Sequence, residues 1–138
     1  RENVGEDFLT CRREINNLLL EENKLMEIVK LIGADVLPDD QKLVIESAKV
    51  IRVGFLQQNA FHKDDTYVPL SKQLLMMKAI LKLHKKSLEL IGSGRTFREI
   101  SATGLFEKLI KMKYDIPNDK PEMFAAYERE IEETLSNI

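Results

Sequence analysis

Two aromatic residues are the first candidates for a ligand site in this chain of 138 residues. Phe61 and Tyr67 lie six residues apart in a segment that lacks helical periodicity. Such a pair could stack on a flat ligand or form an aromatic patch for a partner protein. The pair could equally anchor a long loop to the core, and the residue types alone leave these interpretations open.

The sequence gives poor support for metal coordination. His62, Asp64 and Asp65 are close together, but the second histidine, His84, falls on an apolar helical stripe. A structural zinc site needs four nitrogen or sulfur ligands, whereas the chain has two histidines and one cysteine. We therefore expect no metal site, and we expect His84 to be a half-buried packing residue with its ring nitrogens satisfied.

Two other motifs that suggest catalysis have simpler structural interpretations. Cys11 lies on the inward stripe of the first predicted helix, where a free cysteine behaves as a small hydrophobe. The stretch 92–96 contains two glycines but follows a helix and lacks the spacing of a phosphate-binding P-loop. We expect a turn there, and no self-contained catalytic centre in the chain.

Apolar residues recur at helical steps along most of the chain, which predicts an all-α fold. We expect a helical bundle of about five to six helices, with a long loop over 57–69 between the second and the third. The predicted helices begin near Asp7, Pro38, Ser71, Thr96, Leu105 and Asp119. Capping boxes are expected at 96–99 and 119–122. Gly33 should end the first helix, and Gly54 should weaken the second because an internal glycine costs about 1 kcal/mol.

Two of the predicted helices carry clear apolar stripes. The stripe of the third helix comprises Leu74, Met77, Leu81, His84, Leu88 and Ile91. The stripe of the last helix comprises Phe124, Tyr127, Ile131, Leu135 and Ile138, so this helix should pack lengthwise on the bundle. The third helix also carries Lys78, Lys82, Lys85 and Lys86, which we expect on a solvated face balanced by Glu128, Glu130, Glu132 and Glu133.

The composition fits one globular helical domain over 1–138 and argues against several classes of function. Hydrophobic residues make up 43% of the chain and charged residues 32%. The 21 basic and 23 acidic residues nearly cancel, which is unlike a nucleic-acid-binding module. No apolar run approaches the roughly 18 residues of a membrane-spanning helix. The chain begins at Arg1 rather than at methionine, so we expect a piece of a longer protein.

Several stretches of the sequence resemble one known family. The most specific are FLQQNAF at 55–61, DTY at 65–67, and EIV and LIG within 27–33. Further support comes from ENV at 2–4, KQ and MMK within 72–78, and KMKY at 111–114. Together they extend over nearly the whole chain. It resembles the C-terminal region of the catalytic A subunit of archaeal A-type and vacuolar V-type rotary ATPases.

The resemblance implies that the chain is the C-terminal helical domain of a larger enzyme. The full-length subunit would bind ATP and Mg²⁺ and couple ATP hydrolysis or synthesis to proton or sodium transport. The nucleotide-binding domain, with the catalytic residues, would precede this chain, so the chain alone should have no catalytic residue, no cofactor and no ATPase activity. In the family, this domain closes over the adenine of ATP and transmits its motion to the central rotor stalk.

The resemblance also implies two sites within the chain. Phe61 and Tyr67 take the place of an aromatic pair that packs around the adenine in a more distant relative, the catalytic β subunit of F-type ATP synthases. Asp64 lies where that relative has a small apolar residue, and it is a further candidate for the pocket. The rotor-contact loop would take the place of an acidic loop and comprises Asp35, Val36, Leu37, Pro38, Asp39 and Asp40.

The implied partners are the subunit's own nucleotide-binding domain, the B subunits and the central-stalk subunits of the ATPase. The protein would be cytoplasmic and peripheral on the membrane through the assembled ATPase, with no direct membrane insertion and no nucleic acid. An alternative is a free-standing helical protein–protein interaction module with no nucleotide role. A helical DNA-binding module is a third possibility, which the near-neutral charge disfavours.

Overall fold

The computed structural model describes residues 4–56 and 68–138, and these residues confirm the predicted all-α fold. The elements in chain order are α1 (Val4–Ile32), η1 (Ala34–Val36), α2 (Asp39–Lys49), η2 (Val50–Leu56), α3 (Leu70–Gly92), α4 (Phe97–Ser101), α5 (Leu105–Ile110), α6 (Met112–Asp115) and α7 (Met123–Ser136). η1 is a short 3-10 turn, and η2 is a π-helix that continues α2. The described part therefore has seven α-helices rather than five to six, because the predicted fifth helix is divided at Lys111 into α5 and α6.

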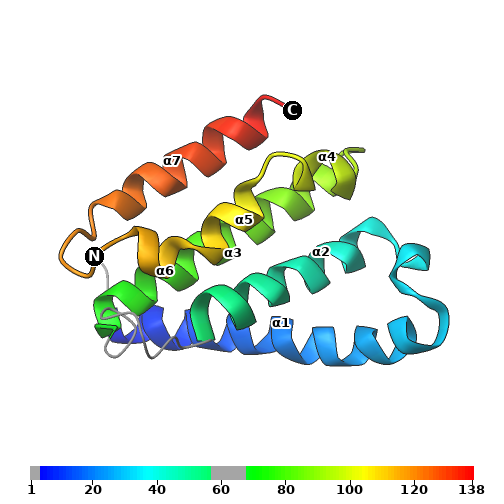
Figure 1. Ribbon diagram of the computed structural model, residues 1–138, viewed down its shortest axis with the longest axis horizontal. Coiled ribbons are helices and arrows are strands. Elements are labelled where there is room, and N and C mark those ends of the chain that lie inside the picture. The colour runs from blue at the N-terminus through cyan, green and yellow to red at the C-terminus, as the bar shows by residue number, and fades with distance from the viewer. Residues whose placement is uncertain (1–3, 57–67) are drawn as a thin grey trace.

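The helices are arranged around α3 (Figure 1). α1 and α2 form an antiparallel hairpin, α3 packs against both of them, and α7 runs along α3. The short helix α5 contacts both η2 and α3. Because α3 has neighbours on several sides, it buries more than the single predicted stripe: Met76 and Ile80 are buried as completely as Met77. The core of the domain is therefore built around one central helix.

The predicted apolar stripes of α3 and α7 are confirmed, with one exposed residue on α3. Leu88 is 45% exposed, although the helical spacing predicts it as a core residue. The buried residues of this stretch are Leu83 and Ser87 instead, so the inward face of α3 is rotated by about one residue near its end. On α7, the four residues of the predicted stripe between 124 and 135 are all buried, and the helix packs lengthwise on α3 as predicted.

The connection between α1 and α2 depends on Gly33. This residue has a φ of 88°, a conformation that glycine adopts at little cost, and its N–H donates to Val29 O at 2.9 Å. The expected end of the first helix is therefore confirmed. Pro38 immediately precedes α2 instead of being its first residue.

The predicted capping box at Thr96 is confirmed, whereas the starts predicted near Asp7, Ser71 and Asp119 are displaced: α1 begins at Val4, α3 at Leu70 and α7 at Met123. Thr96 forms the predicted capping box: its Oγ1 accepts from Glu99 N at 3.1 Å, and its N–H donates to Glu99 Oε1 at 2.9 Å. The second predicted box does not form, because 119–122 is a turn and α7 begins after Glu122 without a side-chain cap. Ser71 is not an N-cap either, because Pro69 occupies that position, where its missing N–H leaves no donor unpaired.

Gly54 has a structural role in addition to the one predicted. It does not merely weaken a helix, because its backbone lies directly against α5. A Cβ atom at this position would be 2.8 Å from Ile110 Cα, which is closer than such atoms pack, and 3.1 Å from Leu109 O, which is a tight contact. The absence of a side chain at Gly54 therefore allows η2 and α5 to approach each other.

Candidate functional site

The predicted aromatic site lies in a part of the chain that the structure does not describe. Phe61, Asp64 and Tyr67 all fall within 57–67, outside the described residues, as do His62 and Asp65. The residues on either side of this segment are described. They are the end of η2 and the first turn of α3, and the start of α3 lies at the end of the molecule opposite η1 (Figure 1).

The flank that precedes the segment is tied to α1 by a charged pair. Arg52 on η2 donates from Nε to Glu22 Oε1 at 3.1 Å and from Nη2 to Glu22 Oε2 at 2.6 Å. Glu22 is only 5% exposed, whereas the side chain of Arg52 is 50% exposed. This is a bidentate pair, in which two charge-assisted hydrogen bonds join the guanidinium to the carboxylate, and such pairs are the stronger ones. It fixes η2 against the middle of α1.

The flank that follows the segment is held by a buried lysine. Lys72 is 2% exposed, and its ammonium donates to Lys113 O at 2.9 Å, Ile116 O at 2.6 Å and Asn118 Oδ1 at 2.7 Å. The next residue, Gln73, donates from Nε2 to Val68 O at 2.9 Å. The first turn of α3 is therefore bonded both to the α6–α7 connection and to the residue that follows the undescribed segment.

The predicted rotor-contact loop spans η1 and the start of α2, at the other end of the hairpin. Asp35, Val36 and Asp40 are exposed, and Leu37 is buried. Asp39 is partly buried, and its Oδ2 accepts from Phe97 N at 2.9 Å, which joins the start of α2 to the start of α4. Only part of the predicted loop is therefore free to contact a partner.

Large apolar residues are exposed at the same end of the molecule. Leu31 is 84% exposed, Ile32 61% and Val36 59%, all at the turn from α1 to α2. Exposed apolar side chains gathered at one place on a surface are typical of a protein–protein contact. We call Leu31, Ile32 and Val36 the apolar tip.

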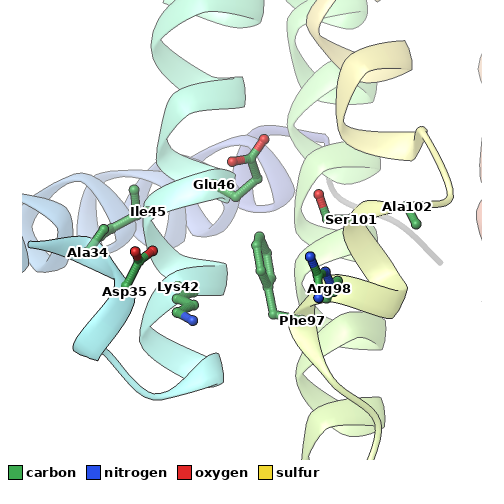
Figure 2. Close-up of a pocket in the computed structure, with 9 residues that line it drawn as sticks. All are labelled: Ala34, Asp35, Lys42, Ile45, Glu46, Phe97, Arg98, Ser101 and Ala102. Carbon is green, nitrogen blue, oxygen red and sulfur yellow. The ribbon is translucent and has the colours of Figure 1, made fainter.

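A groove of about 500 Å³ adjoins the apolar tip, between η1, α2 and α4 (Figure 2). Figure 2 shows the ring of Phe97 between α2 and α4, with Glu46 and Lys42 on the α2 side and Arg98 on the α4 side. Asp35 extends the lining toward η1. Among the described residues, none of these four charged groups is in an ion pair. The groove therefore combines an aromatic surface with available charges of both signs.

The remaining candidates for chemistry have structural roles. Cys11 is 8% exposed and packs in the core, and burial raises the pKa of its thiol, so it is a poor nucleophile. His84 is half-buried, and its Nδ1 is hydrogen-bonded to Ser47 Oγ at 2.8 Å. Burial, followed by the charge of Lys85, lowers the pKa of His84, which is therefore neutral near pH 7. The predicted packing role of Cys11 is therefore confirmed, as are the half-buried position of His84 and a partner for one of its two ring nitrogens.

The basic face of α3 is paired with two helices rather than with one. Lys82 and Lys86 form ion pairs with Glu132 of α7 at 3.8 and 2.6 Å, and the Lys86 contact lowers the pKa of Glu132. Lys78 and Lys85 instead pair with Asp7 and Glu14 of α1, at 3.5 and 2.9 Å. Acidic residues of both α1 and α7 therefore pair with this lysine-rich face. The sequence analysis predicts only the acidic residues of the last helix as its partners.

Two groups that fix the flanks are absent from the sequence-based predictions. Glu22 interrupts the apolar stripe of the first helix, and this acidic residue at an inward position is a signal that could have indicated a buried ion pair. Lys72 gives no comparable signal, because a single lysine in a lysine-rich helix is expected to be exposed. Only the structure places its ammonium in the core.

The described residues contain no cluster of three or more His, Cys, Asp or Glu side chains that could hold a metal ion. In the same described part of the chain, no helix has the length and hydropathy needed to span a membrane.

Comparison with known proteins gives a consistent result. A family model described as the C-terminal domain of V and A type ATP synthase matches residues 1–100. The V-type ATP synthase alpha chain 2 of Clostridium tetani is 50% identical over 118 residues, which are 86% of this chain and 20% of that protein. The V-type ATP synthase alpha chain of Halothermothrix orenii is 44% identical over 138 residues, 100% of this chain and 23% of that protein.

An archaeal relative is also similar over nearly the whole of this chain and over a small part of its own length. The A subunit of the A-type ATP synthase of Methanococcus vannielii is 36% identical over 137 residues, which are 95% of this chain and 23% of that protein. The chain thus spans about a fifth of the length of the curated relatives it matches. The family model covers well over half of the chain, and the helical structure agrees with the resemblance of its sequence motifs. The chain belongs to the family of C-terminal domains of V and A type ATP synthases.

Proposed function

We propose that the chain is the C-terminal helical domain of the catalytic subunit of a rotary, proton- or sodium-translocating A/V-type ATP synthase. In this role it closes over the adenine of ATP at one end and transmits the domain motion to the central rotor stalk at the other. The observation that supports this role best is the separation of the two candidate regions. The flank of 57–67 at the start of α3 and the apolar tip lie at opposite ends of one packed helical body (Figure 1).

A packed helical body is suited to transmitting a displacement. α1 has 29 residues, which gives it a length of about 43 Å at 1.5 Å per residue. Its inward residues Cys11, Ile15 and Leu25 are buried against the bundle. Because protein interiors are close-packed and resist deformation, movement at one end is carried to the other as rigid-body motion.

The adenine contact is assigned to Phe61 and Tyr67, with Asp64 as a further candidate. Stacking between an aromatic ring and a nucleobase contributes about 1–3 kcal/mol per base without reading the phosphates. The phosphates and Mg²⁺ would be held by the nucleotide-binding domain of the full-length subunit. The chain alone is therefore expected to be inactive, and ATP hydrolysis or synthesis belongs to the full-length enzyme.

The stalk contact is assigned to the loop 35–40 together with the apolar tip and the adjoining groove. Asp35, Val36 and Asp40 are exposed there, whereas Leu37 and Asp39 hold the loop to the body. The proposed partners are the central-stalk subunits at this end, and the subunit's own nucleotide-binding domain and the B subunits elsewhere. The assembly would be cytoplasmic and bound to the membrane through the other subunits of the ATPase.

Binding of Mg-ATP to the full-length subunit tests the adenine assignment. We expect Phe61→Ala and Tyr67→Ala to raise the dissociation constant at least roughly fivefold, which corresponds to the loss of about 1 kcal/mol of stacking. Phe97→Ala is the matched control, because this partly exposed aromatic residue lies in the groove at the opposite end. Unchanged affinity in both test variants would refute the nucleotide role and favour a helical interaction module.

A further inference from the structure

Three leucines follow one another along the outward face of α1. Leu9, Leu20 and Leu31 are 64%, 59% and 84% exposed, and each is eleven residues from the next. Eleven residues are close to three turns of an α-helix, so the three side chains lie on one face over a length of about 33 Å. Single exposed leucines are common on protein surfaces. Three at a constant spacing on one helix instead indicate a surface for a second helix.

The residues between these leucines on the same face are polar and also exposed: Arg13, Asn16, Lys24 and Glu27. We call the three leucines and these four residues together the leucine stripe. The other side of α1, where Ile15 and Leu25 are buried, faces α2 and α3. α1 itself runs along one edge of the molecule (Figure 1). The leucine stripe is therefore accessible to a partner over its whole length within the described part of the chain.

The leucine stripe is symmetric about Leu20, and this symmetry indicates the partner. Leu9 and Leu31 are each eleven residues from Leu20, and Arg13 and Glu27 are each seven residues from it. When a second copy of α1 lies antiparallel with Leu20 opposite the partner's Leu20, Leu9 faces the partner's Leu31. In the same register Arg13 faces the partner's Glu27. Because the pairing has two-fold symmetry, each of these two contacts occurs twice.

The charges of the leucine stripe favour the antiparallel direction. Among the described residues, Arg13 forms no ion pair, and Glu27 pairs only with the exposed Lys30, at 3.4 Å. The antiparallel register brings these opposite charges together, and Lys24 then faces the partner's Asn16, whose side-chain oxygen can accept a hydrogen bond. In a parallel pair centred on the same residue, Arg13 would face the partner's Arg13, and Glu27 the partner's Glu27. Like charges at a contact are unfavourable.

We propose that the leucine stripe binds a second copy of this chain in an antiparallel, two-fold symmetric dimer. Three leucines per copy give fewer apolar contacts than a standard interface of about 1,600 Å² provides, so the dimer is reversible, with a dissociation constant between about 1 µM and 1 mM. The inference goes beyond the proposed function. Because Leu31 also belongs to the apolar tip, the dimer and the proposed stalk contact exclude each other, and the dimer belongs to copies that are not assembled with the stalk.

Sedimentation equilibrium of the chain, over concentrations that span this range, tests the proposal. We expect a monomer–dimer equilibrium for the wild type. Leu20→Asp places two carboxylates at the centre of the dimer and should raise the dissociation constant at least roughly tenfold. Leu88→Asp is the matched control, because Leu88 is also exposed, at 45%, but lies on α3. This control should leave the dissociation constant unchanged, and a wild-type chain that is monomeric throughout would overturn the proposal.

An exchange of charges tests the register and keeps the experiment decisive if Leu20→Asp does not fold. Arg13→Glu brings two acidic groups together, and Glu27→Arg brings two basic groups together. Each substitution alone should therefore raise the dissociation constant roughly 3- to 10-fold. The double variant Arg13→Glu/Glu27→Arg restores opposite charges and should return the dissociation constant to within roughly twofold of the wild-type value. Additive weakening in the double variant would overturn the antiparallel register.

Assembly of the ATPase distinguishes a second copy from another partner. If the chain does not self-associate and Leu20→Asp instead prevents assembly of the ATPase, a different subunit covers the leucine stripe and the proposal is wrong. Failure of the dimer leaves the proposed function intact, because the adenine contact is tested by Phe61→Ala and Tyr67→Ala. Loss of those nucleotide effects would equally leave the dimer intact, since the leucine stripe lies entirely on α1.

Discussion

Gly54 lies where η2 meets α5, and its missing side chain determines how closely the two helices approach. The nearest atoms to a methyl group added at this position would be backbone atoms of Leu109 and Ile110, at 2.8 to 3.1 Å. Backbone cannot move aside as the end of a flexible side chain can. A larger residue at position 54 would therefore push η2 away from α5 and disturb the flank of 57–67.

We predict that Gly54→Ala lowers the free energy of unfolding of the chain by about 1–3 kcal/mol, the usual cost of overpacking a core. Urea denaturation measures this change. Gly92→Ala is the matched control, because it lies in α3 with no atom near its Cβ position and should be neutral or slightly stabilising. Equal effects of the two substitutions would show that helix propensity, and not the contact with α5, determines the result.

His84 makes the stability of the chain depend on pH. Burial, and then the charge of Lys85, lowers the pKa of His84 in the folded state below the ordinary value of 6.5. The unfolded chain therefore binds a proton at a higher pH than the folded chain. By linkage, the free energy of unfolding rises with pH between the folded-state pKa and about 6.5, is flat above that range, and is lost on acidification.

Comparison of wild type with His84→Gln isolates this effect, because glutamine does not titrate and all carboxylates are common to both proteins. We expect the free energy of unfolding of wild type, relative to His84→Gln, to decrease as the pH falls below about 6.5. Chemical denaturation between pH 5 and pH 8, the range in which histidine changes its charge, measures this difference. A difference that is independent of pH in this range would contradict the assigned environment of His84.

Among the elements, η2 depends on the Glu22–Arg52 pair for its position against α1. Glu22 is buried and Arg52 half exposed, so Arg52 can return to water when its partner is removed. We therefore predict that Glu22→Ala costs about 1–2 kcal/mol, less than the roughly 3–5 kcal/mol of breaking a fully buried pair. Glu27→Ala, which removes an exposed pair with Lys30 at 3.4 Å, should change stability by less than about 0.5 kcal/mol.

Urea denaturation of Glu22→Ala, Arg52→Ala and the double variant measures the coupling between the two residues. Additive effects would mean that the pair does not stabilise the fold and that η2 is held by packing alone.

The sequence predicts the helices well where their signals are local. The stripe of α7, the glycine that ends α1 and the capping box at Thr96 depend on nearby residues, and the structure has all three. The features that sequence reasoning misses depend on distant partners. The contact of Gly54 with α5 and the bonds of Lys72 both involve segments far along the chain. The exposure of Leu88 likewise follows from which helices surround α3.

The candidate sites are predictable only through the resemblance to a family. Phe61, Asp64 and Tyr67 fall outside the described residues, so their assignment stays a prediction. The resemblance predicts the loop 35–40 as one contact surface, but the structure divides it into exposed residues and residues that hold it to the body, such as Leu37 and Asp39. Periodicity could not indicate this division, because it depends on the position of α4.

For the whole molecule, the proposed role requires two ends with separate functions joined by a rigid body. The apolar tip should contribute to binding of the partner and not to the stability of the fold. Leu31 and Val36 are 84% and 59% exposed, so the double substitution Leu31→Ser/Val36→Ser should change the free energy of unfolding by less than about 0.5 kcal/mol per site. Urea denaturation of the chain checks this expectation, and a larger loss would mean that the tip belongs to the core.

ATP-driven ion transport by the assembled ATPase in vesicles, measured against ATP concentration, tests the two-ended role most directly. We predict that Tyr67→Ala raises the ATP concentration for half-maximal transport at least roughly fivefold, as expected for lost stacking. The tip variant Leu31→Ser/Val36→Ser should instead lower the maximal rate at an unchanged half-maximal concentration, because nucleotide binding is intact while motion is poorly transmitted. If the tip variant transports like wild type, or if both variants shift the same parameter, the account is contradicted.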